Sequence, residues 1–386
     1  MSAPLPASSF DYVLVGGGLQ NALVAHALVA FQPEARVALV EAERRLGQAH
    51  TWCFHGRDID SGATAFVSSL VARRWDGYDV KFPGLDRELS GVYACVTGDR
   101  LHEVTLALFA EHSGRRLLLG KRARRIEAHE VELDDGELLK AEVVIDARGP
   151  SRLEAVVAGY QKFLGLELEF EEPHGLVRPL LMDARVDQVD GFRFMYVLPF
   201  GPTRALVEDT RFSDTSALSQ PELRGEILAY VRARGLTVKE VVREELGILP
   251  LPSRLPKAEL KSPLKAGYAG GWLHPTTGYS FPVAARLANF IARRPPERLF
   301  GAEFERLALE QARQVRFANS LNRLLFDAIA PEHRRAVFER FYRLDAATIS
   351  RFYALTTEPL DRARILCGRP PRGLSLRRAL SRGVSL

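Results

Sequence analysis

The sequence contains few cysteines and no long uninterrupted apolar segment. Three cysteines occur among 386 residues, and Cys53, Cys95 and Cys367 stand far apart, without the spacing of metal ligands. This pattern predicts buried free thiols in a reducing compartment and no metal site. No run of about 18 uncharged apolar residues is present, so we expect no membrane-spanning helix. The first residues lack a basic segment followed by an apolar one, which argues against a secretory signal.

The positive charge is modest overall but is concentrated late in the chain. The formal net charge is +5, while seven arginines between Arg362 and Arg382 follow a single acid, Asp361. Such a segment contacts anionic lipid headgroups or nucleic acid, or is simply solvated. No helix-turn-helix, RNA-binding or zinc pattern accompanies it, so nucleic acid is not an expected partner.

The most informative segment runs from Val13 to Asn21 and reads Val-Leu-Val-Gly-Gly-Gly-Leu-Gln-Asn. It predicts a strand that passes through a glycine turn into an alanine-rich helix over 22–30. Strand, tight turn and helix N-terminus together form a site for a dinucleotide pyrophosphate. Gly16 supplies the turn and Gly18 lets the backbone approach the phosphates. Asn21 stands where the usual pattern has a third glycine.

A second strand and a carboxylate extend this unit. Residues 36–40 are apolar and predict a strand, and Glu41 follows at its end. A carboxylate about 20 residues beyond the turn binds the ribose hydroxyls in such sites. The β-α-β order therefore predicts a bound adenine dinucleotide, and a β-α-β unit without a ligand is the alternative.

Two distant segments contain loops of the same kind. A hairpin over 125–139 leads into a strand over 141–145, whose closing loop contains Asp146 and Gly149. Far downstream, a loop with glycines precedes a helix over 283–293. Its candidate cofactor-binding residues are Gly270, Gly271, Thr277 and Gly278. Since helix N-termini bind anions, we expect these pieces to complete one flavin-type domain.

The expected fold is α/β: a Rossmann-like FAD-binding domain of the glutathione-reductase type with an inserted antiparallel-sheet substrate domain and a helical C-terminal region. Residues 163–251 alternate polar and apolar positions, as antiparallel strands do, and the pattern becomes helical from about Pro296. The predicted domains are 1–60, 100–160 and 262–295 for the cofactor, 61–99 and 161–261 for the substrate, and 296–386 for the helical region with its basic tail.

An acidic residue follows a strand rich in aromatic side chains. Alternate positions of this strand carry Phe192, Phe194, Tyr196, Leu198 and Phe200. After a turn over 201–203, the returning strand places Glu208 on one face and Asp209 on the other. Apolar surroundings raise the pKa of a carboxyl group, which suits a proton donor, and aromatic faces stabilise carbocations. An ordinary half-buried sheet with Glu208 at its edge is the alternative.

Taken together, these residues resemble the bacterial lycopene β-cyclases. The glycine turn with its asparagine is followed, in order and over almost the whole chain, by further matching segments. They are His50-Thr51-Trp52-x-Phe54-His55, Leu198-Pro199-Phe200, Val207-Glu208-Asp209-Thr210, Gly270 to Ser280, Asn322 to Phe326, Arg340-Phe341-Tyr342 and Arg351-Phe352-Tyr353.

The resemblance implies an isomerase (an intramolecular lyase) that needs reduced FAD in a non-redox role, with NAD(P)H as the electron source. Protonation of lycopene at C2 gives a C1 cation, which the C5=C6 bond attacks, and loss of the C6 proton leaves a β-ionone ring. The products are γ-carotene and β-carotene. Glu208 is the implied proton donor and a candidate for the proton acceptor. Asp209 either tunes Glu208 or has a structural role.

The resemblance also implies contacts with lycopene and related acyclic carotenes. The candidate substrate-binding residues are Trp52, His55, Phe194, Tyr196, His274 and Tyr279. Core packing is the alternative for Trp52, and a loop hydrogen bond is the alternative for His274. Lycopene dissolves in the bilayer, so we expect peripheral attachment at the cytoplasmic side of a membrane. An apolar helical stripe from Phe338 to Leu355 is a candidate surface, and core packing is the alternative for it.

Two other functions share parts of this pattern. A flavin-dependent monooxygenase or polyprenyl reductase carries the same glycine turn, but the acid beside the aromatic strand favours a cyclase. A prenyl-binding protein without enzymatic activity would bind isoprenoid and leave it unchanged.

Overall fold

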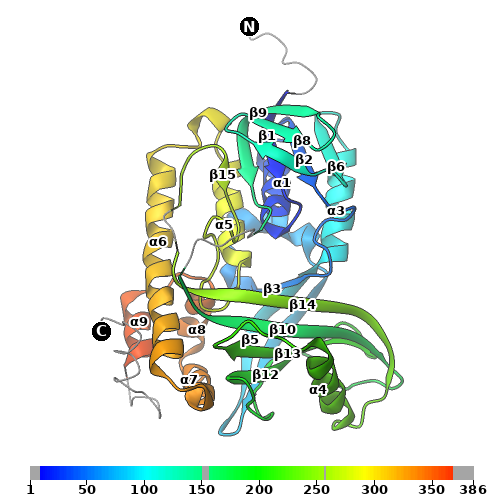
Figure 1. Ribbon diagram of the computed structural model, residues 1–386, viewed down its shortest axis with the longest axis vertical. Coiled ribbons are helices and arrows are strands. Elements are labelled where there is room, and N and C mark those ends of the chain that lie inside the picture. Colours follow the sequence, from blue (N-terminus) through cyan, green and yellow to red (C-terminus); the bar gives the residue numbers. More distant parts are fainter. Residues whose placement is uncertain (1–8, 150–155, 256–257, 368–386) are drawn as a thin grey trace.

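The computed structural model describes residues 9–149, 156–255 and 258–367. Figure 1 shows one sheet in the upper half of the molecule, a second sheet below it and a column of helices along one side. The chain passes between the two halves several times, so segments distant in sequence build each sheet.

Seven strands within the described residues form the first sheet, in the order β6-β2-β1-β9-β8-β7 with β15 beside β9. β1 lies between β2 and β9 and is parallel to both. The strands are β1 (Ser9–Val15), β2 (Val37–Glu41), β6 (Arg115–Leu119), β7 (Ala123–Ile126), β8 (Glu130–Leu133), β9 (Leu138–Asp146) and β15 (Leu264–Lys265). The predicted hairpin turn at 134–136 joins β8 to β9.

Helices cover this sheet. α1 (Leu19–Phe31) follows the glycine turn and is buried from Leu19 to Leu28, because it packs between the sheet and α5 (Phe281–Ala292). An apolar helix buried on nearly every side is typical of such a central position. α2 (Ser61–Val67) and α3 (Gly98–Ala110) also pack against α1.

The second sheet has eight strands in the described part of the chain, in the order β14-β10-β13-β12-β11-β4-β5-β3. They are β3 (Thr51–His55), β4 (Arg73–Phe82), β5 (Leu85–Thr97), β10 (Val156–Phe170), β11 (Leu180–Asp183), β12 (Phe192–Pro199), β13 (Arg204–Ser213) and β14 (Val238–Arg254). All pairings are antiparallel except that of β11 with β4.

This sheet curves until its two edge strands meet. Arg243 on β14 donates to Thr51 Oγ1 on β3 at 2.9 Å and also to the Ala49 carbonyl. The backbone N–H of Thr51 donates to Glu245 Oε1 at 3.1 Å. Figure 1 shows β3 and β14 side by side at the top of the lower half. The concave face therefore encloses a space below the first sheet.

The remaining helices follow β15 and α5 in sequence. They are α6 (Ala302–Arg323), α7 (Arg334–Phe341), α8 (Ala346–Tyr353) and α9 (Pro359–Leu366). In Figure 1 α6 extends along both halves of the molecule, and α7, α8 and α9 lie beside the lower half. Among the helices that the structure describes, none is long and apolar enough to cross a bilayer.

The predicted mixed α/β fold class, with its helical C-terminal region, is confirmed. Two details differ. β3 pairs with β5 of the second sheet although it precedes the predicted boundary at residue 60, and the predicted sheet over 163–251 also contains a helix, α4 (Gln220–Arg232). The prediction of buried thiols is wrong for Cys367, which is exposed. The arginines from Arg369 to Arg382 lie outside the described residues.

Candidate active site

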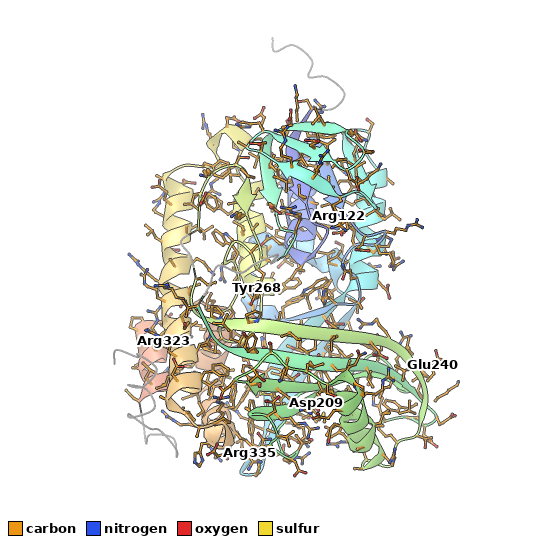
Figure 2. All side chains as sticks on the ribbon, viewed as in Figure 1. Arg122, Asp209, Glu240, Tyr268, Arg323 and Arg335 are labelled. Carbon is orange, nitrogen blue, oxygen red and sulfur yellow. The ribbon has the colours of Figure 1, made fainter. Side chains whose placement is uncertain are left out.

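A cavity of about 780 Å³ lies between the glycine turn and the concave face of the second sheet. Figure 2 shows Tyr268, one of its lining residues, at the level between the two halves of the molecule. Of the predicted site residues, those that line the cavity are Gly18, Trp52, His55, Gly149, Phe194, Tyr196, Glu208, Thr277, Gly278 and Tyr279. Those that do not are Gly16, Asn21, Glu41, Asp146, Asp209, Gly270, Gly271 and His274.

The glycine turn forms one end of the cavity. Gly16 has a φ of +100°, and an added Cβ would lie 2.7 Å from the Ala147 carbonyl oxygen, so glycine is required there. A Cβ on Gly18 would meet no atom of the described residues within 4 Å. Asn21 does not reach the cavity; its Nδ2 donates to the carbonyls of Val15 and Gly16, both at 3.0 Å, and holds the turn together.

Two predicted carboxylates flank this turn. Glu41, at the end of β2, accepts a hydrogen bond from the Gly17 N–H at 2.6 Å. Asp146, at the end of β9, forms a paired contact with Arg148, with both N–O distances 2.9 Å. Both acids thus lie beside the turn without lining the cavity.

The loop before α5 contributes part of the cavity wall, through Thr277, Gly278 and Tyr279. His274 of the same loop is fully buried and points elsewhere: its Nε2 donates to the Phe352 carbonyl at 2.9 Å and its Nδ1 accepts from the Thr276 N–H. Burial lowers the pKa of His274 to about 4. Its predicted contact with substrate is therefore wrong, and the loop hydrogen bond is the observed role.

Gly270 and Gly271 also lie away from this cavity. They line a separate groove beside α6. A Cβ on Gly270 would overlap the Lys265 carbonyl oxygen. The predicted cofactor contact of these two glycines is not what the structure shows, because close backbone packing explains Gly270 instead.

Glu208 lies on the concave face of the second sheet, at the opposite end from the turn. Tyr196 of β12 is directly across from it, and Gly165 of β10 is its neighbour on the other side. Its side chain accepts a hydrogen bond from the Thr210 hydroxyl. Glu208 is 9% exposed, and burial, followed by the charges of Glu245 and Asp209, raises its pKa to about 8.

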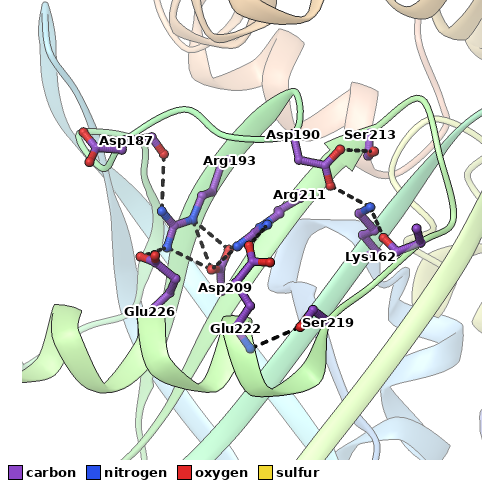
Figure 3. Close-up of polar contacts among 11 residues, drawn as sticks. Lys162, Asp187, Asp190, Arg193, Asp209, Arg211, Ser213, Ser219, Glu222 and Glu226 are labelled. Carbon is purple, nitrogen blue, oxygen red and sulfur yellow. Dashed lines mark hydrogen bonds and ion pairs between the residues drawn. The ribbon is translucent and has the colours of Figure 1, made fainter.

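Asp209, the next residue, lies on the opposite face of the sheet. Its carboxylate pairs with Arg193 at 2.9 Å and with Arg211 at 3.3 Å, and all three side chains are buried. Figure 3 shows both arginines continuing to Glu226 and Glu222 of α4. Asp209 therefore anchors α4 to the sheet and does not line the cavity, so it has the structural role that the sequence left open, while its charge also contributes to the raised pKa of Glu208.

Aromatic and polar side chains close the cavity around His55. Its ring is 5.0 Å from the Tyr93 ring and 5.2 Å from the Tyr353 ring, measured between centroids. His55 Nδ1 lies 3.2 Å from Asp58 Oδ2, to which the Tyr279 hydroxyl donates at 2.9 Å. Together with Phe194 and Tyr196, these rings make the cavity that Glu208 lines largely apolar and rich in π faces.

Almost the whole sequence matches a family model. Residues 11–379 match the model described as lycopene cyclase protein. This chain belongs to the lycopene cyclase family. A lycopene beta-cyclase from Pseudescherichia vulneris is 38% identical over 369 residues and one from Pantoea ananas is 37% identical over 367 residues. The alignments cover 94% of this chain in each case, and 94% and 95% of those proteins.

Solved structures extend the likeness of the fold beyond the family. A geranylgeranyl bacteriochlorophyll reductase-like protein from Thermoplasma acidophilum has a TM-score of 0.59 at 13% identity, covering 97% of this chain and 95% of its own. A probable FAD-dependent monooxygenase from Pseudomonas aeruginosa has a TM-score of 0.54 at 17% identity, covering 92% and 98%. At these identities the likeness concerns the fold alone.

Three residues at the site were not among the predicted site residues. Glu245 and His50 line the cavity, although His50 was noted only as part of a family segment, and Asp58, which does not line it, binds both His55 and Tyr279. The sequence around Glu245 indicated a functional role only weakly, because Glu245 stands beside another glutamate in a strand whose exposure alternates. Only the curvature of the sheet brings it next to His50, 195 residues earlier in the chain.

Proposed function

We propose that this protein is a lycopene β-cyclase, which protonates an acyclic end of lycopene and closes β-ionone rings. The observation that carries the proposal is the place of Glu208: a buried carboxyl group, with a pKa of about 8, on the aromatic-lined wall of a large cavity. At neutral pH this group holds its proton and can deliver it to a hydrocarbon bound in the cavity.

The glycine-turn end of the cavity fits a flavin dinucleotide. Gly18 leaves space where any other side chain would project, and the N-termini of α1 and α5 have no side-chain cap, so their N–H groups are available to anionic groups. Glu41 lies at the end of β2, where the family's fold binds ribose. When bound, reduced FAD would supply negative charge that stabilises a cationic substrate. NAD(P)H is the proposed electron source.

The chain's own residues account for the acid chemistry. Glu208 would transfer its proton to C2 of the terminal double bond, which leaves a cation at C1. The C5=C6 bond then attacks C1, and loss of the C6 proton gives the ring, so the product is an isomer of the substrate. The rings of Phe194, Tyr196 and Tyr93 line the same space and would stabilise the positive charge through their π faces.

The helical region supports access for an apolar substrate. Part of the predicted apolar stripe lines the cavity, through Phe338, Phe341, Leu344 and Phe352. Leu366 of α9 also lines it and is half exposed, and Leu360 on the same helix is 59% exposed. We therefore propose that the protein lies peripherally on the cytoplasmic side of a membrane and takes lycopene and related acyclic carotenes from the bilayer.

Expression in a lycopene-accumulating bacterium tests this function. The wild-type protein should convert lycopene into products of unchanged mass that chromatograph as γ-carotene and β-carotene. Glu208→Gln should leave lycopene unconverted, because the amide cannot donate the proton, while flavin content and thermal unfolding show that the variant is folded. A product that gains hydrogen or oxygen would instead identify a reductase or a monooxygenase. Unchanged lycopene with folded, flavin-loaded wild-type protein would refute the proposal.

A further inference from the structure

A row of residues crosses the concave face of the sheet and contains two acids. Glu208 on β13 is paired with Gly165 on β10, and Gly165 is paired on its other side with Glu245 on β14. A Cβ on Gly165 would lie 3.5 Å from Glu208 Oε2 and 3.1 Å from Leu206 Cδ1. Glycine therefore keeps the position between the two glutamates free of a side chain, so that they face each other across it.

Glu245 is buried, and its two oxygens have different surroundings. The residue is 6% exposed and lines the cavity. Its Oε1 accepts from the Thr51 N–H at 3.1 Å and lies 3.4 Å from His50 Nδ1. Its Oε2 has no hydrogen-bond partner among the described residues, and Arg243 Nη1 is 3.6 Å away. One oxygen is thus fixed, and the other is unsatisfied.

His50 links this pair to solvent. Its side chain is 48% exposed, yet it also lines the cavity and contacts Glu245. Besides His50 and Arg243, the charged or titratable groups around the two glutamates are Tyr196 across β12 and Asp209 on the far face of β13. Burial raises the pKa of Tyr196 well above its usual value, so Tyr196 stays neutral.

We propose that Glu208 and Glu245, which flank Gly165 without a direct hydrogen bond between them, act as one electrostatically linked acid–base pair that carries a single proton, with His50 exchanging that proton with solvent. This inference rests on the proposed cyclase function. In the first step the O–H bond of Glu208 breaks and the C2–H bond forms, which leaves two carboxylates facing each other. In the second step the C6–H bond breaks and its proton goes to the pair. The pair returns to its singly protonated form, and no net proton is consumed.

The charge of Glu245 also favours the proton on Glu208, since two acids that face one cavity across a single glycine resist double ionisation. Glu245→Gln removes that charge. The fall in activity on the alkaline side should then occur at a pH lower by about one unit or more, and the rate at pH 8 should fall by about fivefold or more. Lowering the pH should restore part of the rate, which loss of folded protein would not allow.

Glu167→Gln is the matched control. Glu167 is a buried glutamate on β10, two residues from Gly165, and it accepts from Arg243 Nε at 2.8 Å. It shares the arginine with Glu245 but is not among the residues that line the cavity. Its replacement should leave the pH at which activity falls unchanged. An equal shift in both variants would assign the effect to Arg243 and overturn the acid–base pair.

Deuterium labelling tests the exchange with solvent without relying on Glu245 variants. Wild-type protein in D₂O should place about one deuterium at C2 of each ring. His50→Gln should lower that fraction at least twofold, because protons returned from C6 are reused before they exchange. If the label is unchanged in a folded His50→Gln protein, or Glu245→Gln keeps the wild-type pH profile, the inference is wrong although the cyclase function stands. If wild-type protein makes no cyclic product, the function itself fails.

Discussion

Gly16 and Ala147 are in contact across the carboxyl ends of β1 and β9, and a Cβ added to Gly16 would lie 2.7 Å from the Ala147 carbonyl oxygen. Gly16→Ala should therefore lose flavin and about 1–3 kcal/mol of stability, from the positive φ and the overlap together. Flavin absorbance per protein and thermal unfolding measure both effects.

Gly18→Ala separates cofactor contact from folding. Gly18 has an ordinary φ of −82°, and an added Cβ meets nothing within the described structure. The variant should unfold at the wild-type temperature yet bind flavin more weakly, by about tenfold or more. Equal flavin affinity in Gly18→Ala and wild type would contradict the placement of the cofactor at this end of the cavity.

Cyclisation should depend on the protonated form of Glu208. Since burial raises its pKa to about 8, the rate should be highest below that pH and fall above it, approaching tenfold per pH unit. Initial rates between about pH 6 and 10, with flavin kept reduced, provide the test. A rate that shows no fall between pH 6 and 10 would contradict control of cyclisation by a carboxyl group with a pKa of about 8.

The same pKa predicts a gain in stability for Glu208→Gln. Between pH 4.5 and about 8 the unfolded chain gives up the Glu208 proton while the folded protein keeps it, so stability falls as pH rises through this interval. The amide has no such dependence, and at pH 8 the variant should be more stable by about 1–3 kcal/mol. Chemical unfolding of wild type and Glu208→Gln at pH 5 and pH 8 measures this difference. A free energy of unfolding that depends on pH equally in both proteins would contradict the prediction.

Asp209→Asn, by contrast, should lower the stability of the protein. It leaves Arg193 and Arg211, both buried, without their shared carboxylate. Breaking a buried ion pair by removing one partner costs about 3–5 kcal/mol, so the variant should unfold at markedly lower denaturant concentration. Protein that remains folded should still cyclise, with the alkaline fall in rate moved slightly to lower pH, because the charge of Asp209 contributes to the raised pKa of Glu208. A variant with wild-type stability and no cyclase activity would show that Asp209 has a catalytic role.

Much of the fold could be predicted because its signals are local. The glycine turn, the strand before it and the helix after it all lie within Val13 to Phe31, and α1 begins where the turn ends. The alternation from Phe192 to Phe200 correctly predicted β12, and the face assignment of Glu208 is confirmed by its pairing with Tyr196. Sequence periodicity indicates which face of a strand a side chain occupies, even where it does not indicate which segment packs against that face.

The features of the site that could not be predicted depend on contacts between segments distant in the sequence. His274 has the composition of a site residue, but its burial against Phe352 follows from the packing of α8 on a loop 78 residues earlier. Glu245 reaches the cavity only because the sheet curves until β14 meets β3. Neither arrangement leaves a pattern in the neighbouring sequence, so both had to be seen in three dimensions.

The ion pairs of Asp209 have a further consequence for strand alignment. Sliding β13 by one residue against its neighbours would exchange the two faces, bringing Asp209 into the cavity and sending Glu208 toward α4. Arg193 on β12 opposes that slip, because it would lose the Asp209 carboxylate, and Arg211, which moves with Asp209 on β13, would lose its ion pair with Glu222 of α4. A salt cluster remote from the chemistry thus decides which of two adjacent acids faces the carotenoid.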